Sequence, residues 1–296
     1  MSYGGSPENL NPTGLPEPAP SRGPSLLGSG GATFRNVAIA LLSTVVVFGL
    51  LAVFVVESAG WPAVREAFFN GTYFRASFSP IAHAFVLNIK LFCVCEVAIL
   101  ILALLLAVIR SLPGAVFFPL RLMAIVYTDL FRGVPTILVV LLLGFGAPSL
   151  DLTDVPTSAV FWAGTALVLV YTAYVSEVYR AGIESVHPSQ EAAARSLGLS
   201  RWQTTRKVIL PQAVRRVIPP LLNDFIGLQK DTALVGLLGP IEAFNQSNID
   251  VNSTFNFTPY LVATALFVAI TIPLARFTDW LIARDRRRRQ AQGLVT

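Results

Sequence analysis

The chain has 296 residues, of which 54% are hydrophobic and 13% charged, and its formal net charge is +5. An average soluble domain carries about 25% charged residues, and a mean hydropathy of +0.64 is too high for a single globular core. This composition excludes an ordinary soluble enzyme, a disordered protein and a disulfide scaffold, and it indicates a polytopic membrane protein. The only two cysteines, Cys93 and Cys95, are too few for a disulfide framework or a zinc site, so we expect no metal and no cofactor.

The first segment, 1–34, is rich in glycine, proline and serine. Such a composition cannot bury enough apolar surface to offset the entropy of ordering, so a disordered tail is predicted. It does not resemble a signal peptide, because no basic start leads into a short apolar stretch.

Six apolar stretches follow, each near the roughly 20 residues that a bilayer-crossing helix needs. Membrane β-strands would be shorter and would alternate in polarity, so α-helices are predicted. The fifth stretch is interrupted by proline, glycine and charged residues. The six stretches cover 36–56, 84–109, 120–146, 155–176, 217–244 and 251–275.

Basic residues are concentrated on one side of the predicted membrane topology. Six spans place both termini on one side, which holds the basic residues of the 177–216 loop and the basic end at 284–296. The opposite loops contain only Arg65 and Arg75 as basic residues. Since basic loops stay in the cytoplasm, both termini are predicted to be cytoplasmic. This placement accounts for the positive charge without nucleic acid, and 286–289 is predicted to anchor the chain at lipid headgroups.

The 188–211 stretch carries helix signals outside the membrane. Pro188 suits a first helical position, and Glu191 falls in the first turn, where the helix dipole favours an acid. Gly198 can adopt the left-handed conformation that ends a helix. A second helix is predicted from the capping box that begins at Ser200. Two short helices joined at a glycine are equally consistent with a docking element and with a surface hairpin that has no partner.

This loop resembles the EAA loop of bacterial ABC-importer permeases, with the pattern EAA-x3-G-x9-I-x-L-P. The expected glutamate falls on Ala192, and the acid appears one residue earlier, as Glu191. The final Pro211 is expected to end the unit. The residues that the resemblance assigns to an ATPase-coupling loop are Pro188, Gln190, Glu191, Ala192, Ala193, Ala194, Arg195, Gly198, Leu210 and Pro211.

Four further segments resemble motifs of polar amino acid ABC permeases. Together with the loop, they occur in the family's order at consistent spacing. They read DLFRGVP at 129–135, AYVSEVYRAGI at 173–183, LPQAV at 210–214 with a following PLLN at 220–223, and QKDTAL at 229–234.

The resemblance implies an all-α integral membrane protein with the five-helix, MetI-like core of type I ABC importers. An extra N-terminal transmembrane helix is predicted over 35–57, ahead of a permease domain over 84–283 that contains the coupling loop 188–211. The flanking cytoplasmic tails are predicted over 1–34 and 284–296.

Two pairs of opposite charges are predicted within the membrane. Asp129 and Arg132 are three residues apart, as are Glu177 and Arg180, so each pair shares a helix face. A charge at the bilayer centre costs roughly 2.5–3.5 kcal/mol, so it needs a partner or a watery cavity. Structural ion pairing is favoured here over substrate contact.

Four polar residues lie in the broken fifth stretch: Asn223, Asp224, Lys230 and Asp231. Irregular backbone at membrane depth is tolerated only against protein or a watery cavity, and broken helices often line transport paths. These four residues are therefore the predicted pathway.

The resemblance implies the permease subunit of an importer for a polar amino acid such as glutamate or glutamine, in the bacterial plasma membrane. No Gly-Lys dipeptide occurs, so there is no Walker-type phosphate loop, and the chain is not expected to be an enzyme. The implied partners are a separate ATP-binding subunit, an extracytoplasmic solute-binding protein and a second permease, identical or different. The alternatives are a secondary transporter with an acidic proton relay and a membrane scaffold without transport.

Overall fold

The structure, a computed structural model, describes residues 30–151 and 153–291, and all regular structure in this part is helical. The described residues divide into two units, of which the first ends at Pro62 and the second begins at Ala63. The first unit contains α1 (Gly30–Val56), which includes the first predicted span and begins five residues before the predicted 35. Most of the predicted tail over 1–34 lies outside the described residues.

The second unit contains the predicted permease domain. Its helices are α2 (Trp61–Phe68), α3 (Gly71–Ser111), η1 (Ala115–Phe117), α4 (Phe118–Gly133), α5 (Thr136–Ser149), α6 (Ala159–Glu184), α7 (Pro188–Ser196), α8 (Arg201–Thr204), η2 (Thr205–Ile209), α9 (Leu210–Asp231), η3 (Thr232–Leu238), α10 (Ala243–Thr254) and α11 (Thr258–Ala291).

The second predicted span, over 84–109, lies within a longer helix, because α3 begins at Gly71. The Asn70 side chain accepts hydrogen bonds from the backbone N–H groups of Thr72 and Tyr73, and so caps the helix start. The predicted span therefore lacks the first 13 residues of α3.

The predicted third span, over 120–146, is two helices. α4 and α5 meet at an angle of 102°. Val134 is extended, with φ of −93° and ψ of 132°, and Pro135 follows it. Proline lacks a backbone N–H and disfavours helical geometry in the preceding residue, so the helix stops here. The predicted third span is therefore not a single straight helix but a pair of helices bent at Pro135.

The predicted fifth span, over 217–244, also differs from the structure. α9 begins at Leu210 and ends at Asp231, and the 3-10 helix η3 follows directly. Gly239, with φ of +103°, ends η3 in the left-handed conformation. Similarly, the first residues of the predicted sixth span belong to α10, which ends at Thr254 and is capped by Phe255 with φ of +53°.

Helix length and composition identify the segments that can cross a membrane. Four stretches are long and apolar enough, and the bent α4–α5 pair makes a fifth if it is counted as one span; the four are Phe34–Val56, Trp61–Ser111, Ala159–Glu184 and Thr258–Arg284. α9 is not among these segments, and it carries arginine, lysine and aspartate side chains along its length.

α6 lies at the centre of the main core, where it packs against α3, α4, α5 and α9. Small residues on α6 allow neighbouring helices to approach closely. A Cβ at Gly182 would collide with the Val217 side chain of α9, so only glycine fits there. The fully buried side chains of α6 include Ala163, Ala166, Leu167 and Val170.

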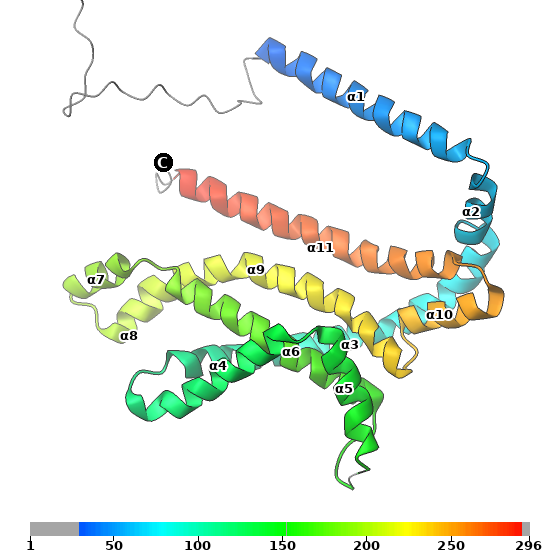
Figure 1. The fold of residues 1–296 in the computed structure, drawn as a ribbon. Helices are drawn as coiled ribbons and strands as arrows, with labels where there is room; N and C mark the ends of the chain where they lie inside the picture. Colours follow the sequence, from blue (N-terminus) through cyan, green and yellow to red (C-terminus); the bar gives the residue numbers. More distant parts are fainter. Residues whose placement is uncertain (1–29, 152, 292–296) are drawn as a thin grey trace, which may run out of the picture. The chain divides into compact units, whose positions relative to one another are not determined.

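A second core joins α3, α10 and α11 through Ile81, Phe85, Ala243 and Val262. In Figure 1, α10 lies at one end of α9, whereas α7, α8 and the C-terminal end of α11 lie toward the other. The unit therefore has two distinct ends, one formed around α10 and one formed around the α7–α8 hairpin.

Candidate functional site

The α7–α8 hairpin begins with a histidine cap. The His187 Nδ1 atom accepts a hydrogen bond from the Ser189 backbone N–H at 3.2 Å, and Pro188 is the first helical residue. Glu191 lies in the first turn of α7. Ala194 is buried against the rest of the unit, whereas the predicted coupling residues Gln190, Glu191, Ala192, Ala193 and Arg195 are exposed.

Gly198 makes the turn between the two helices, with φ of +83°. This is the left-handed region that the sequence predicted for it. The predicted capping box is also present. The Ser200 N–H donates to Gln203 Oε1 at 2.9 Å, and the Gln203 N–H donates to Ser200 Oγ at 3.3 Å.

The second helix of the hairpin does not end at Pro211. It passes through the π-helical turn η2 into α9, so Leu210 and Pro211 are the first residues of α9. Proline lacks a backbone N–H and cannot donate to the regular α-helical ladder, and the π-helical turn Thr205–Ile209, where that ladder is already interrupted, lies directly before α9. The hairpin is thus continuous with the helix that contains the predicted pathway residues.

Two large apolar side chains at the hairpin are exposed. Leu197 is 83% exposed and Trp202 is 69% exposed. Neither residue was among the predicted coupling residues, although they lie on either side of the Gly198 turn. Tryptophan is enriched at protein interfaces, so the exposed Trp202, with Leu197 beside the same turn, favours a docking surface over a hairpin without a partner.

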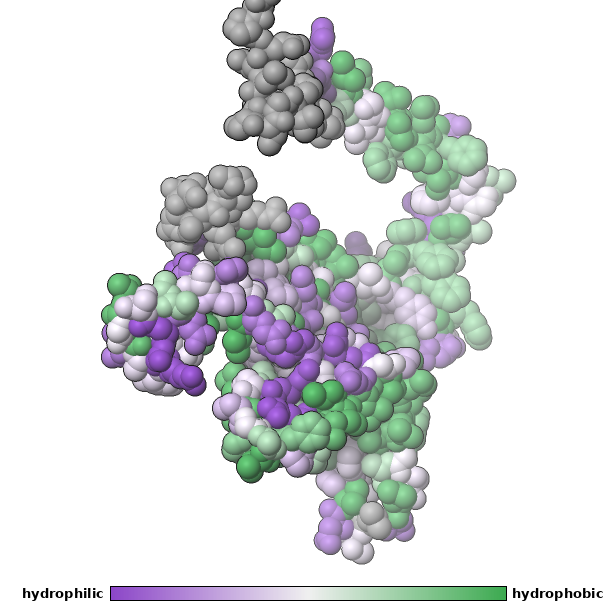
Figure 2. All heavy atoms as spheres, turned by 60° about the vertical axis from the view of Figure 1, so that its left-hand side comes forward, coloured by the Kyte–Doolittle hydropathy of each residue, from purple (hydrophilic) through white to green (hydrophobic). Residues whose placement is uncertain are grey.

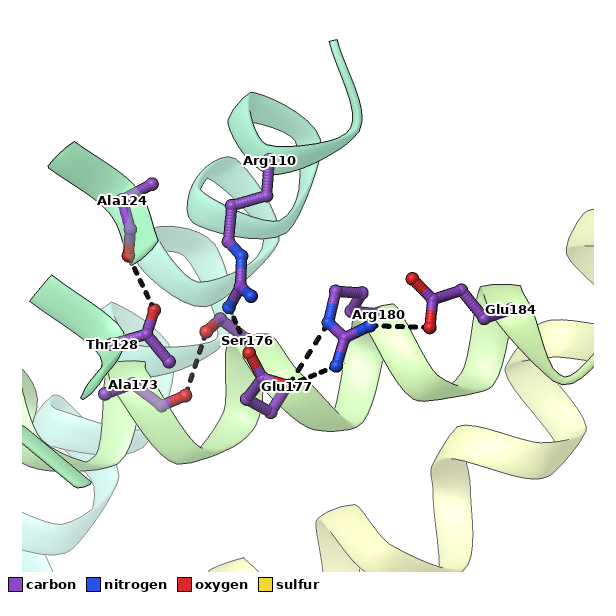
Figure 3. Close-up of polar contacts among 8 residues, drawn as sticks. All are labelled: Arg110, Ala124, Thr128, Ala173, Ser176, Glu177, Arg180 and Glu184. Carbon is purple, nitrogen blue, oxygen red and sulfur yellow. Dashed lines mark hydrogen bonds and ion pairs between the residues drawn. The ribbon is translucent and has the colours of Figure 1, made fainter. Parts of the chain in front are cut away.

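Glu177 lies in a charge network that joins α3 to α6 (Figure 3). Arg110 of α3 forms an ion pair with Glu177, and Arg180 pairs with the same carboxylate at 2.7 Å. Arg180 also reaches Glu184 at 2.6 Å. The sequence predicted only the Glu177–Arg180 pair. It missed Arg110, because a partner on another helix leaves no spacing signal along the chain.

Asp129 and Arg132 do not form the predicted ion pair within the described part of the chain. Asp129 is exposed on α4. The Arg132 guanidinium lies instead over the Tyr174 ring of α6, 5.9 Å from the ring centroid. Packing of α4 against α6 offers the guanidinium an aromatic face, which the three-residue spacing could not reveal.

The four predicted pathway residues of α9 have different surroundings. Asn223 and Lys230 are exposed. Asp231 is partly buried, and its Oδ2 atom accepts a hydrogen bond from the Tyr171 hydroxyl of α6 at 2.9 Å. Asp224 is partly buried, and its Oδ2 atom has no hydrogen-bond partner among the described residues.

A pocket of about 440 Å³ brings several of these residues together. It lies where the end of α4 meets α6 and α9. Figure 2, which brings the α7–α8 end of the unit forward, shows hydrophilic residues across the middle of this face beside a hydrophobic surface. The polar side chains that line the pocket are Arg132, Tyr174, Glu177, Ser185, Arg216 and Asp224.

A buried polar cluster near the Lys230–Asp231 segment was not predicted from the sequence. Asn88 of α3 donates to Glu242 Oε2 at 2.8 Å and to Thr232 Oγ1 at 3.2 Å. Glu242 also accepts from the backbone N–H groups of Phe244 and Asn245, and so caps α10. The cluster joins α3, η3 and α10 at the end of the unit away from the hairpin.

Residues 99–287 match the family described as binding-protein-dependent transport system inner membrane component. Two curated relatives come from bacteria. The "Probable glutamine ABC transporter permease protein GlnM" of Bacillus subtilis is 34% identical over 171 residues, which is 57% of this chain and 77% of the relative. The "Probable amino-acid ABC transporter permease protein PatM" of Vibrio harveyi is 35% identical over 159 residues, 53% of this chain and 71% of the relative.

Solved structures give the same picture. A crystal structure of an amino acid ABC transporter with histidines matches with a TM-score of 0.63 and 28% identity, over 70% of this chain and 94% of the other. An inward-facing structure of the MetNI methionine ABC transporter matches with a TM-score of 0.54 over 69% of this chain and 95% of the other. At 16% identity, the second match concerns the fold alone.

Proposed function

Because this chain belongs to the family of inner membrane components of binding-protein-dependent transport systems, we propose that it is the permease subunit of an ABC importer for a polar amino acid. The family membership makes it a multi-pass membrane protein with a transport role. Relatives named as glutamine and amino-acid permeases support this substrate class, with glutamine or glutamate as the first substrates to test.

The exposed α7–α8 hairpin carries the proposal. A self-contained secondary transporter has no need of a helical hairpin outside the membrane with exposed Leu197 and Trp202 at its turn. In the proposed importer, residues 188–211 contact a separate ATP-binding subunit. Movement of that subunit reaches α9 directly, because η2 joins the hairpin to α9 without a loop. ATP hydrolysis in the partner then changes the position of the pathway residues.

The other proposed partners follow from the two ends of the unit. With the hairpin in the cytoplasm, α10 lies toward the opposite side, where an extracytoplasmic solute-binding protein would dock. A second permease, identical or different, would pair with this one to complete the pathway. This chain would contribute Asn223, Asp224, Lys230 and Asp231 to it. Both termini are proposed to be cytoplasmic.

ATP-dependent uptake tests the proposal. The permease is reconstituted with its ATP-binding subunit and binding protein in proteoliposomes, and uptake of radiolabelled glutamine and glutamate is measured with ATP and with a non-hydrolysable analogue inside. We expect uptake only with ATP and only with the binding protein present. Uptake that follows a proton gradient without ATP would overturn the proposal in favour of a secondary transporter.

A further inference from the structure

The pocket between α4, α6 and α9 contains equal numbers of positive and negative side chains. Arg132 and Arg216 line it, as do Glu177 and Asp224, so their formal charges cancel. The remaining lining includes the Tyr174 ring and the small or apolar residues Val178, Ala181, Gly182 and Pro220. A neutral pocket with separated charges is complementary to a ligand that also carries one charge of each sign.

Two of these four charges are already engaged within the described chain. Arg110 and Arg180 both pair with the Glu177 carboxylate. Arg216 donates a hydrogen bond to the Ser185 carbonyl oxygen. The Glu177 carboxylate is therefore matched by two guanidinium groups, whereas the bond to Ser185 anchors Arg216 to the wall of the pocket and uses one of its five N–H donors.

The other two charged groups, Asp224 and Arg132, have neither an ion pair nor a side-chain hydrogen bond among the described residues. The Asp224 Oδ2 atom is buried and accepts no hydrogen bond from the described residues. Arg132 forms no ion pair within the described part of the chain, and its guanidinium lies over the Tyr174 ring. A buried carboxylate oxygen without a donor is costly, so Asp224 is suited to accept hydrogen bonds from a group that enters the pocket.

We propose that this pocket binds the α-ammonium and α-carboxylate groups of an amino acid. Asp224 accepts hydrogen bonds from the ammonium group, and Arg132 donates to the carboxylate, for which a planar guanidinium offers two parallel N–H groups. The inference rests on the proposed function and adds which atoms of the substrate are recognised. Both residues bind the group that all α-amino acids share, so side-chain selectivity lies elsewhere.

Direct binding to the purified complex of permease and ATP-binding subunit tests this site without the binding protein. Equilibrium dialysis in nanodiscs uses three probes. Glutamine carries both charged groups, N-acetylglutamine lacks the ammonium group, and 4-aminobutanamide lacks the carboxylate. Each probe is measured against the wild type, Arg132→Gln and Asp224→Asn, and size-exclusion chromatography establishes that each variant is assembled.

We expect Arg132→Gln to weaken glutamine binding by about tenfold or more, the usual size of one charge-assisted hydrogen bond. It should leave 4-aminobutanamide binding within about twofold, because that probe has no carboxylate to lose. Asp224→Asn should show the converse pattern, with glutamine weakened and N-acetylglutamine unchanged. Arg132→Lys and Asp224→Glu keep the charges and should retain the preference for glutamine.

Arg276→Gln and Asp279→Asn are the matched controls, since they make the same chemical changes at an exposed ion pair on α11 outside the pocket. The proposal is overturned if wild type shows no saturable glutamine binding, or if Arg132→Gln and Asp224→Asn weaken all three probes equally. Either result leaves ATP-dependent uptake by the complete transporter intact. The failure of this site is therefore distinguishable from the failure of the proposed function.

Discussion

At the scale of single residues, sequence spacing predicted helix faces but not partners on other helices. Glu177 and Arg180 are three residues apart and do pair, at 2.7 Å. Asp129 and Arg132 have the same spacing but no ion pair in the described chain, because the Arg132 guanidinium lies over Tyr174. Spacing places two side chains on one face, and the neighbouring helix then decides which contact forms.

Loss of Arg110 should destabilise the contact between α3 and α6. Its side chain is only 14% exposed, and it shares the Glu177 carboxylate with Arg180. Arg110→Gln should cost about 1–3 kcal/mol, because a partly buried carboxylate loses a charged donor. The midpoint of thermal unfolding of the detergent-solubilised complex measures this. Arg276→Gln removes an exposed pair and should change the midpoint little; equal shifts in the two variants would contradict the prediction.

Asp231→Asn should reduce uptake but not assembly. The asparagine side-chain oxygen can still accept the Tyr171 hydrogen bond, so the packing of α9 against α6 is retained. The negative charge next to Lys230 is lost, and with it the proposed role in the pathway. Co-purification with the ATP-binding subunit and ATP-dependent uptake are the two measurements. If the variant fails to co-purify, Asp231 has a structural role instead.

At the scale of helices, the apolar pattern predicted which regions are helical better than where helices end. The predicted third span continued through Pro135, where the chain bends by 102°. The predicted capping box at Ser200 is present, because its signal is local. Neither the capping of α10 by Glu242 nor its contact with Asn88 was predicted, since the second contact joins residues 154 positions apart.

Replacing one carboxylate oxygen of Glu242 by an amide nitrogen should weaken the cap of α10. Glu242 is 1% exposed and accepts three hydrogen bonds from Asn88, Phe244 and Asn245. Glu242→Gln places an amide N–H₂ group against one of these donors and should cost about 1–3 kcal/mol. Hydrogen exchange should accelerate in α10 but not in α7. Glu57→Gln, at an exposed glutamate whose side chain has no hydrogen bond among the described residues, is the control. Unchanged protection of α10 in Glu242→Gln would refute the cap's importance.

Gly198 should direct the hairpin without affecting insertion. At φ of +83° a residue with a Cβ is strained, by roughly 1 kcal/mol for alanine and more for a β-branched side chain. Gly198→Val should therefore express and insert normally, retain less ATP-binding subunit on co-purification and uncouple ATP hydrolysis from uptake. Gly146→Val is the control, because no atom lies within 4 Å of its added Cβ and its φ is not positive. Full retention with normal coupled uptake would exclude residues 188–211 as the contact.

At the scale of the whole molecule, the charge distribution in the sequence and the arrangement of helices in the second unit agree on which regions lie toward the same end. The C-terminal end of α11 lies toward the same end as α7 and α8 (Figure 1). The sequence predicted the basic residues of 177–216 and 284–296 on one side of the membrane, and the α7–α8 hairpin and the described end of α11 do lie toward one end. α1 belongs to the other unit, so the prediction that the N-terminus is cytoplasmic depends on the distribution of basic residues.

Cysteine labelling in intact cells tests the orientation of both termini. In a background with Cys93 and Cys95 replaced by alanine, single cysteines are placed at Tyr3 and Gln290, and at Asn252 of α10. Since the basic loops are retained in the cytoplasm, a membrane-impermeant maleimide should label only Asn252→Cys in intact cells. All three should react once the cells are permeabilised. Labelling at Gln290→Cys in intact cells would invert the topology and place the α7–α8 hairpin outside, where no ATP-binding subunit could reach it. Labelling at Tyr3→Cys but not at Gln290→Cys would instead show that α1 does not cross the membrane as predicted. The orientation of the permease domain would then be unchanged.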